Sequence, residues 1–150
     1  ERVRREANGL PVVLHGDAPG AELRALYGRA SVFWHATGLG EDERRHPHRL
    51  EHFGITTVEA MSAGAVPVVI DRAGQREIVE HGVSGLLFGT LDELVSQTRR
   101  VIADAGLRAE LSAGAARRAS TFDTGRFADR LLELVAGLEE PRPTAGQPGT

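Results

Sequence analysis

The chain has 150 residues and a net charge of −3, with 41% hydrophobic and 26% charged residues, which is typical of one globular domain with its own core. This charge argues against a general affinity for nucleic acid, and the absence of cysteine excludes disulfides, thiolate catalysis and cysteine-based zinc sites. No apolar run is long enough to span a bilayer and no signal peptide pattern is found, so we expect a cytoplasmic protein.

Short apolar runs alternate along the chain with segments of helical periodicity. The helix that begins near residue 90 should have Thr90 as its N-cap, because Glu93 follows three residues later in a capping-box pattern. A polar loop is expected at 38–50 and a disordered tail at 141–150, where almost no core-forming residue occurs. We expect strands at 10–14, 31–36, 66–70 and 85–88, and helices at 1–8, 21–30, 55–63, 75–80, 90–103, 107–120 and 124–138.

Strands that alternate with helices predict parallel βα units. The fold class expected is therefore α/β, with a Rossmann-like doubly wound parallel sheet of about four strands.

The most informative stretch runs from Glu51 to Gly64 and reads EHFGITTVEAMSAG. Two carboxylates, Glu51 and Glu59, flank a glycine turn at Gly54 and the start of a predicted helix. Backbone N–H groups and the helix dipole at such a start hold phosphate, while carboxylates accept hydrogen bonds from hydroxyl groups. The pattern therefore predicts a site for a polar, phosphorylated ligand.

This motif, together with AVPVVI and AGQREIVEHGVSGLLF after it, resembles the nucleotide-sugar-binding domain of retaining GT-B glycosyltransferases of family 4, the glycosyltransferase group 1. That family has two glutamates separated by seven residues, a Phe-Gly between them, and Glu-Ala-Met at the second. Pro-Val-Val, a glycine-rich turn before Glu-Ile-Val, and Gly-x-x-Gly follow. This chain has all of these in order over about residues 10–88. The resemblance implies a partial C-terminal half of a GT-B fold, with residues 1–140 as the nucleotide-sugar-binding domain.

The resemblance also implies a role for each motif residue. Glu51 would be the catalytic residue, which contacts the donor sugar beside its anomeric carbon and stabilises positive charge there. Glu59 would bind the ribose hydroxyls, and backbone N–H groups at the helix start would bind the β-phosphate and sugar. The family usually has two glycines where this chain has Gly74-Gln75, near the nucleotide base. The donor-binding set implied is Phe53, Gly54, Ile55, Thr56, Glu59 and Gly74.

Ordinary structural explanations exist for the same residues. Glu59 could merely complement the helix dipole, which is worth about 0.3–1 kcal/mol, and Glu51 could be a solvated loop residue. The segment Phe53–Thr56 could be an ordinary helix start with threonine caps. Trp34 and His35 lie near the carboxyl end of a predicted strand, where ligands bind in such sheets, but core positions explain them equally well.

A histidine-rich segment, HPHRLEH, spans residues 46–52. Alternating histidines on a strand can chelate a metal ion, but Pro47 and the neighbouring charges indicate a loop. We therefore expect no metal site. All 18 basic residues are arginine, so no lysine ammonium is available to a phosphate.

In the family, two further strands lie between those expected here at 10–14 and 31–36, and they carry an arginine and a lysine that clamp the donor diphosphate. They are absent from this chain, so a fragment of a longer protein is expected. If this chain is the whole molecule, we expect the two strands to pair directly, Val12–Leu14 against Val32–Trp34, because a crossover of about 26 residues can join immediate neighbours. If it is a piece of a longer protein, the two further strands would lie outside this sequence. Strand exchange between copies of the chain is the next expectation.

The function expected is donor binding in a retaining glycosyltransferase that moves a hexose from a nucleoside-diphosphate sugar to an acceptor hydroxyl, with no cofactor besides that donor. The partners expected are the donor, an unidentified acceptor and the N-terminal acceptor-binding domain of the parent chain, and this chain alone should be inactive. The alternative is an isolated nucleotide or sugar-phosphate binding module without catalysis. A sugar epimerase is less favoured, because it would have other signature residues around its carboxylates.

Overall fold

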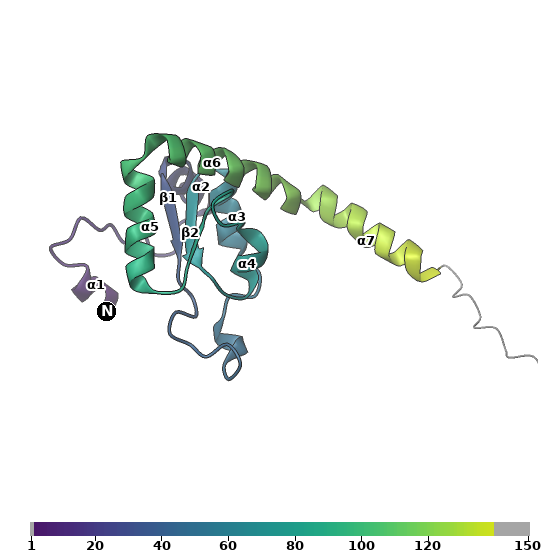
Figure 1. The fold of residues 1–150 in the computed structure, drawn as a ribbon, viewed down its shortest axis with the longest axis horizontal. Coiled ribbons are helices and arrows are strands. Elements are labelled where there is room, and N and C mark those ends of the chain that lie inside the picture. The colour runs from purple at the N-terminus through teal and green to yellow at the C-terminus, as the bar shows by residue number, and fades with distance from the viewer. Residues whose placement is uncertain (1, 140–150) are drawn as a thin grey trace, which may run out of the picture.

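A computed structural model of the chain describes residues 2–139, so the tail predicted to be disordered at 141–150 lies outside the described residues. The arrangement of the elements is shown in Figure 1. The strands are β1 (Val32–His35), β2 (Val66–Ile70) and β3 (Leu86–Phe88). The helices are α1 (Arg2–Glu6), α2 (Gly20–Arg29), α3 (Ile55–Ser62), α4 (Gly74–Ile78), α5 (Leu91–Ala103), α6 (Ala105–Ala119) and α7 (Thr124–Glu139), with short 3₁₀ turns η1 (Pro47–Arg49) and η2 (Ser120–Phe122).

The three strands form one parallel sheet in the order β1-β2-β3, which confirms the predicted α/β fold. In the register, Trp34 lies beside Val68, and Val69 lies beside Leu87. Strand β2 is buried at every position because it is central in the sheet and covered on both faces. Its unbroken apolar run, VPVVI, is typical of such a strand.

Two hydrophobic clusters pack against opposite faces of β2. Val66, Val68 and Ile70 join Leu94 and Val101 of α5 on one face. On the other face, the side chain of Val69 packs with Met61 of α3 and Ile78 of α4, since successive strand residues point to opposite sides. Helix α6 contributes Leu111 to the first cluster and Ala115 to the second, because it crosses one end of the layers (Figure 1).

The expected strand at 10–14 is wrong, and so is its pairing with residues 32–34. The apolar side chains of this segment are exposed, namely Leu10, Val12, Val13 and Leu14, and 77% of the Val13 surface is accessible to solvent. The backbone makes local turn bonds instead, from the Leu10 N–H to the Ala7 carbonyl at 3.1 Å and from the Val12 N–H to the Leu10 carbonyl at 2.8 Å. Pro11 fixes its own φ and lacks the N–H that a ladder needs, so this segment bends locally. The sheet of the described residues therefore has three strands, not four.

Helix boundaries elsewhere lie close to the predicted ones. The Thr90 hydroxyl accepts the Glu93 N–H at 3.2 Å and caps α5, as predicted. The Glu93 carboxylate accepts the N–H of Gly89 at 2.6 Å, one residue before the position that a capping box would use. Helix α7 points away from the layers (Figure 1), and its apolar residues Phe127 and Leu134 are exposed.

Candidate functional site

Glu51, Phe53, Gly54 and Gly74 belong to the connections that follow β1 and β2, at the carboxyl edge where parallel sheets bind ligands. His35 ends β1, and the turn from Glu51 to Gly54 leads into α3. Ala73 and Gly74 follow β2 and open α4. The Gly74 N–H donates to the Glu51 backbone carbonyl at 3.1 Å, which joins the two turns directly.

The Glu51 side chain is held by its own turn. Its Oε1 accepts the Phe53 N–H at 3.3 Å and the Gly54 N–H at 3.1 Å, while its Oε2 lies 3.4 Å from Nε2 of His35. One third of the side chain remains exposed. Two backbone N–H groups and the His35 ring therefore orient the Glu51 carboxylate, and the exposed third of the side chain remains accessible to a ligand.

Helix α3 begins with a glycine in the left-handed region. Gly54 is the N-cap at φ 88° and ψ 48°, and no side chain caps the helix, so the threonine caps considered from the sequence do not form. Phe53 and Gly54 give their N–H groups to Glu51 in this structure, whereas no described residue outside the helix accepts from Ile55 or Thr56. The first N–H groups of a helix have no partner within it, so these two are available to an anion. Donation by all four residues to a ligand stays a prediction.

Gly74 is required by the close approach of the two turns. A Cβ atom added at Gly74 would lie 2.6 Å from the carbonyl carbon of His52 and 2.9 Å from the nitrogen of Phe53. Its neighbour Ala73 has φ 41° and ψ −133°, a conformation that glycine adopts far more readily. A glycine at position 73 would relieve this strain, whereas Gln75 lies within α4.

Gln75 is fully buried beneath the turn that starts α3. Its Oε1 accepts the Thr57 hydroxyl at 3.0 Å, and its Nε2 has no partner among the described residues. A Cβ atom on Gly54 would lie 2.6 Å from that Nε2. The amide thus supports the glycine turn from below, and any larger residue at 54 would displace it.

Glu59 lies in a different environment from Glu51. It is exposed on α3 and lines a cavity of about 350 Å³ between α2 and α3, with Tyr27 and Arg24 among the other lining residues. Burial, and after it the nearby negative charge of Glu59, raise the pKa of the Tyr27 hydroxyl. The Tyr27 ring is also fixed by an edge-to-face contact with Phe33 at 6.0 Å between centroids.

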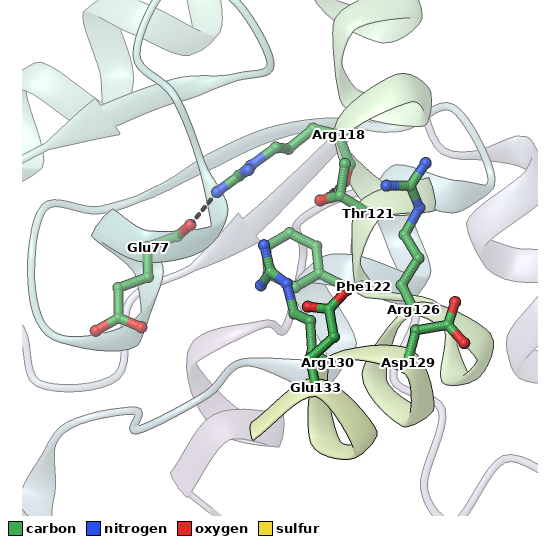
Figure 2. Close-up of a pocket in the computed structure, with 8 residues that line it drawn as sticks. All are labelled: Glu77, Arg118, Thr121, Phe122, Arg126, Asp129, Arg130 and Glu133. Carbon is green, nitrogen blue, oxygen red and sulfur yellow. Dashed lines mark hydrogen bonds between the residues drawn. The ribbon is translucent and has the colours of Figure 1, made fainter. Parts of the chain in front are cut away.

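A larger cavity of about 600 Å³ lies between α4, η2 and α7 (Figure 2). Figure 2 shows Arg118 reaching from α6 to the backbone of Glu77, and its guanidinium lies 4.8 Å from the centre of the Phe122 ring. Phe122 meets Phe53 edge-to-face at 6.3 Å, so this cavity adjoins the turn at Glu51. The lining residues are Glu77, Arg118, Thr121, Phe122, Arg126, Asp129, Arg130 and Glu133.

The polar loop at 38–50 folds beside the site and contacts the turn after β2. Leu50 is buried, and the Arg72 guanidinium donates to the Glu41 carbonyl. His46 and His48 stack edge-to-face at 6.0 Å, and residues 2–139 contain no group of three side chains that could hold a metal ion. Within the same residues, no helix is both long and apolar enough to cross a membrane.

Sequence reasoning missed three side chains that the structure brings to this region. Tyr27 precedes β1 by five residues, and nothing local connects it to Glu59. From the sequence, Gln75 is only a departure from the glycine pair of the family, and nothing local shows that its amide is buried beneath Gly54. Phe122 lies between the helices expected at 107–120 and 124–138, where the sequence indicates no contact with the motif. All three meet the motif only through tertiary packing.

Comparison with known proteins agrees with this architecture. Residues 6–118 match the family model described as Glycosyl transferases group 1. The chain is 33% identical over 89 residues to a GDP-Man:Man(3)GlcNAc(2)-PP-Dol alpha-1,2-mannosyltransferase of Dictyostelium discoideum, covering 59% of this chain and 18% of the relative. It is 36% identical over 90 residues to a D-inositol 3-phosphate glycosyltransferase of Salinispora arenicola (strain CNS-205), covering 59% and 20%. The chain spans about a fifth of the length of these curated relatives.

Among solved structures, Anabaena Alr3699/HepE in complex with UDP-glucose superimposes with a TM-score of 0.73 at 25% identity. The match covers 91% of this chain and 35% of that chain. The fold of nearly all of the chain is therefore shared with a protein that was crystallised with a nucleotide sugar.

Replacing Gly74 with alanine should destabilise the chain by about 1–3 kcal/mol, because the new Cβ atom would overlap backbone atoms of His52 and Phe53, which cannot move independently. Urea denaturation gives the free energy of unfolding. Gly16→Ala is the matched control, since nothing lies within 4 Å of its Cβ position and its φ is not positive. Equal midpoints for Gly74→Ala and the unaltered chain would contradict the close approach.

Tyr27 should titrate above the usual pKa of a tyrosine, and Glu59→Gln should lower that pKa without returning it fully to the usual value. Burial is the larger cause and remains in the variant, whereas the negative charge is removed. Phenolate absorbance reports Tyr27 alone, because the chain has a single tyrosine. An unchanged titration in Glu59→Gln would show that the two side chains do not interact.

Proposed function

The chain belongs to the group 1 glycosyltransferase family, and we propose that it binds a nucleoside-diphosphate sugar and provides the donor site for retaining transfer of a hexose to an acceptor hydroxyl. The observation that carries the proposal is the start of α3, where the N–H groups of Ile55 and Thr56 have no acceptor among the described residues. In the sequence, Glu51 precedes this helix start and Glu59 follows it. A diphosphate between a sugar and a ribose needs an anion site flanked by acceptors for hydroxyls.

The backbone would carry most of the phosphate binding. The chain has no lysine, and the arginines nearest the Gly74 turn already have partners: Arg72 donates to the Glu41 carbonyl and Arg76 to the Asp71 carboxylate at 2.7 Å. The N–H groups and the dipole of α3 supply positive potential without a mobile side chain. The left-handed conformation of Gly54 starts α3 at this point, and Gln75 fills the space that a Cβ atom would occupy.

Glu59 is proposed to accept hydrogen bonds from the ribose hydroxyls. It lies one turn into α3, beside a cavity of about 350 Å³, and its carboxylate is exposed. Two vicinal hydroxyls fit the two oxygens of a carboxylate. The crystal complex of Anabaena Alr3699/HepE with UDP-glucose, a related fold at 25% identity, supports a nucleotide sugar as the ligand class.

Glu51 is proposed to act at the sugar. In retaining transfer, the acceptor oxygen attacks the anomeric carbon on the face from which the diphosphate leaves, and the acceptor proton passes to the departing phosphate oxygen. The bond between the anomeric carbon and the diphosphate breaks as positive charge develops on the sugar. A fixed carboxylate beside that carbon stabilises the charge, and Gly74 packs against the turn that fixes it. The acceptor contacts, and a cytoplasmic location, stay predictions.

Nucleotide titration tests the proposal. UDP, GDP and ADP are each added to the chain while its unfolding temperature is measured, with uridine, guanosine and adenosine as controls without phosphate. Ligand at about 100 times its dissociation constant should stabilise the folded state by about 2.7 kcal/mol. Stabilisation by one diphosphate and not by its nucleoside supports the donor site, and binding without turnover in a full-length protein would favour the alternative of a binding module. No stabilisation by any diphosphate would overturn the proposal.

Substitutions of Glu51 and Glu59 should affect different kinetic constants in a full-length protein that carries this chain. Glu59→Ala should raise the donor KM more than it lowers kcat, because a ribose contact is the same in the ground state and the transition state. Glu51→Ala should lower kcat by at least about 10²-fold, since its contact lies beside the reacting carbon. An unchanged donor KM with collapsed turnover in Glu59→Ala would contradict its assignment, and near-normal turnover in Glu51→Ala would remove Glu51 from the site.

A further inference from the structure

His35 lies outside the motif, and its side chain faces the Glu51 carboxylate. It is the last residue of β1, and its side chain is 13% exposed. Its Nε2 faces Glu51 Oε2 at 3.4 Å, whereas its Nδ1 is buried without a partner among the described residues. A buried polar atom with no partner is uncommon and calls for an explanation.

The buried Nδ1 indicates which ring nitrogen carries the proton. In a neutral imidazole, one nitrogen is a donor and the other an acceptor. An N–H at Nδ1 would be a buried donor with no acceptor, while Nε2 would then present a lone pair to a carboxylate. Placing the proton on Nε2 avoids both costs, because the Nε2–H faces Glu51 and only an acceptor lone pair is left unused at Nδ1.

We propose that His35, protonated at Nε2, is a positioning residue that holds the Glu51 carboxylate in its reactive orientation. This inference rests on the proposed role of Glu51 in sugar transfer. His35 is not part of the family motif. Backbone pairing with Val69 and packing against Phe33 hold it in place.

The fold makes His35 a rigid support. The residue pairs in register with Val69 of the central strand, and its ring lies 6.4 Å from that of Phe33. Glu51, by contrast, sits on a turn, and only its Oε1 is fixed by backbone N–H groups. Without His35, rotation about the last side-chain torsion would exchange the two carboxylate oxygens or turn Oε2 away. The Nε2–Oε2 separation of 3.4 Å is longer than the usual N–H···O hydrogen bond, so the contact in this structure is an electrostatic one between the ring and the carboxylate.

Three substitutions separate positioning from packing. In His35→Gln the side-chain amide nitrogen reaches the place of Nε2 and can still donate to Glu51. In His35→Leu the volume is kept but no donor remains, and His35→Asn places its amide nearer to Nδ1. His52→Gln is the matched control, because it makes the same chemical change one residue after Glu51, in a side chain that is exposed and has no hydrogen bond to a described residue.

Turnover is measured in the full-length protein with UDP-glucose and GDP-mannose, as release of the nucleoside diphosphate. His35→Leu and His35→Asn should lower kcat roughly 10- to 100-fold, the scale expected when a reacting group is misplaced by about 1 Å, while the donor KM changes less than about 3-fold. His35→Gln should recover most of the rate, and His52→Gln should match the unaltered protein. Wild-type kcat in His35→Leu, or a His35→Gln variant as slow as His35→Leu, would overturn the proposal.

Nitrogen NMR of the ¹⁵N-histidine-labelled chain tests the contact without any activity. The chain has six histidines, and His35→Gln identifies the signals of His35. We expect a proton on Nε2 and a shift of that signal in Glu51→Gln but not in Glu59→Gln. A proton on Nδ1, or an Nε2 chemical shift that is unchanged in Glu51→Gln, would overturn the inference. Full turnover in Glu51→Ala would instead refute the proposed function, and the NMR result alone would then decide whether the two side chains interact.

Discussion

The candidate site depends on the close approach of two turns at the carboxyl edge of the sheet. The Gly74 N–H donates to the Glu51 carbonyl, and no Cβ atom could be accommodated at Gly74 without meeting the backbone of His52 and Phe53. This contact ties the connection after β1 to the connection after β2. It sets the direction of the Glu51 side chain and the entry of α3, and so the position of every proposed donor contact relative to the sheet.

The sheet makes this approach rigid. Strand β2 is buried on both faces, with Met61 and Ile78 on one side and Leu94 and Val101 on the other, so the turn that leaves its carboxyl end begins from a fixed point. A fixed framework matters because electrostatic stabilisation of a transition state works only with groups oriented in advance. The strain at Ala73, at φ 41°, occurs at the junction of the two turns, where functional sites commonly depart from relaxed geometry.

Glu51 and Glu59 illustrate how the same side chain acquires different properties on one short segment. Glu51 is fixed by two backbone N–H groups and faces His35, whereas Glu59 lies in a cavity wall and interacts with the Tyr27 hydroxyl. The first arrangement suits a group that must hold its direction while charge develops nearby. The second suits a group that binds a polar ligand equally before and during reaction.

The sequence alone determined the features that depend on local pattern. The run VPVVI predicts a buried strand, Thr90 predicts a cap, and the spacing of Glu51, Gly54 and Glu59 predicts a helix start between two carboxylates, because each signal lies within a few neighbouring residues. Only the tertiary structure decided whether the apolar segment 10–14 forms a strand, because a strand requires a pairing partner as well as hydrophobic residues. This segment bends at Pro11 and pairs with none of the described strands. The contacts of Tyr27 with Glu59 and of His35 with Glu51 were likewise decided by packing. Each joins residues at least 16 positions apart, and no periodicity specifies which side chains meet at the edge of a folded sheet.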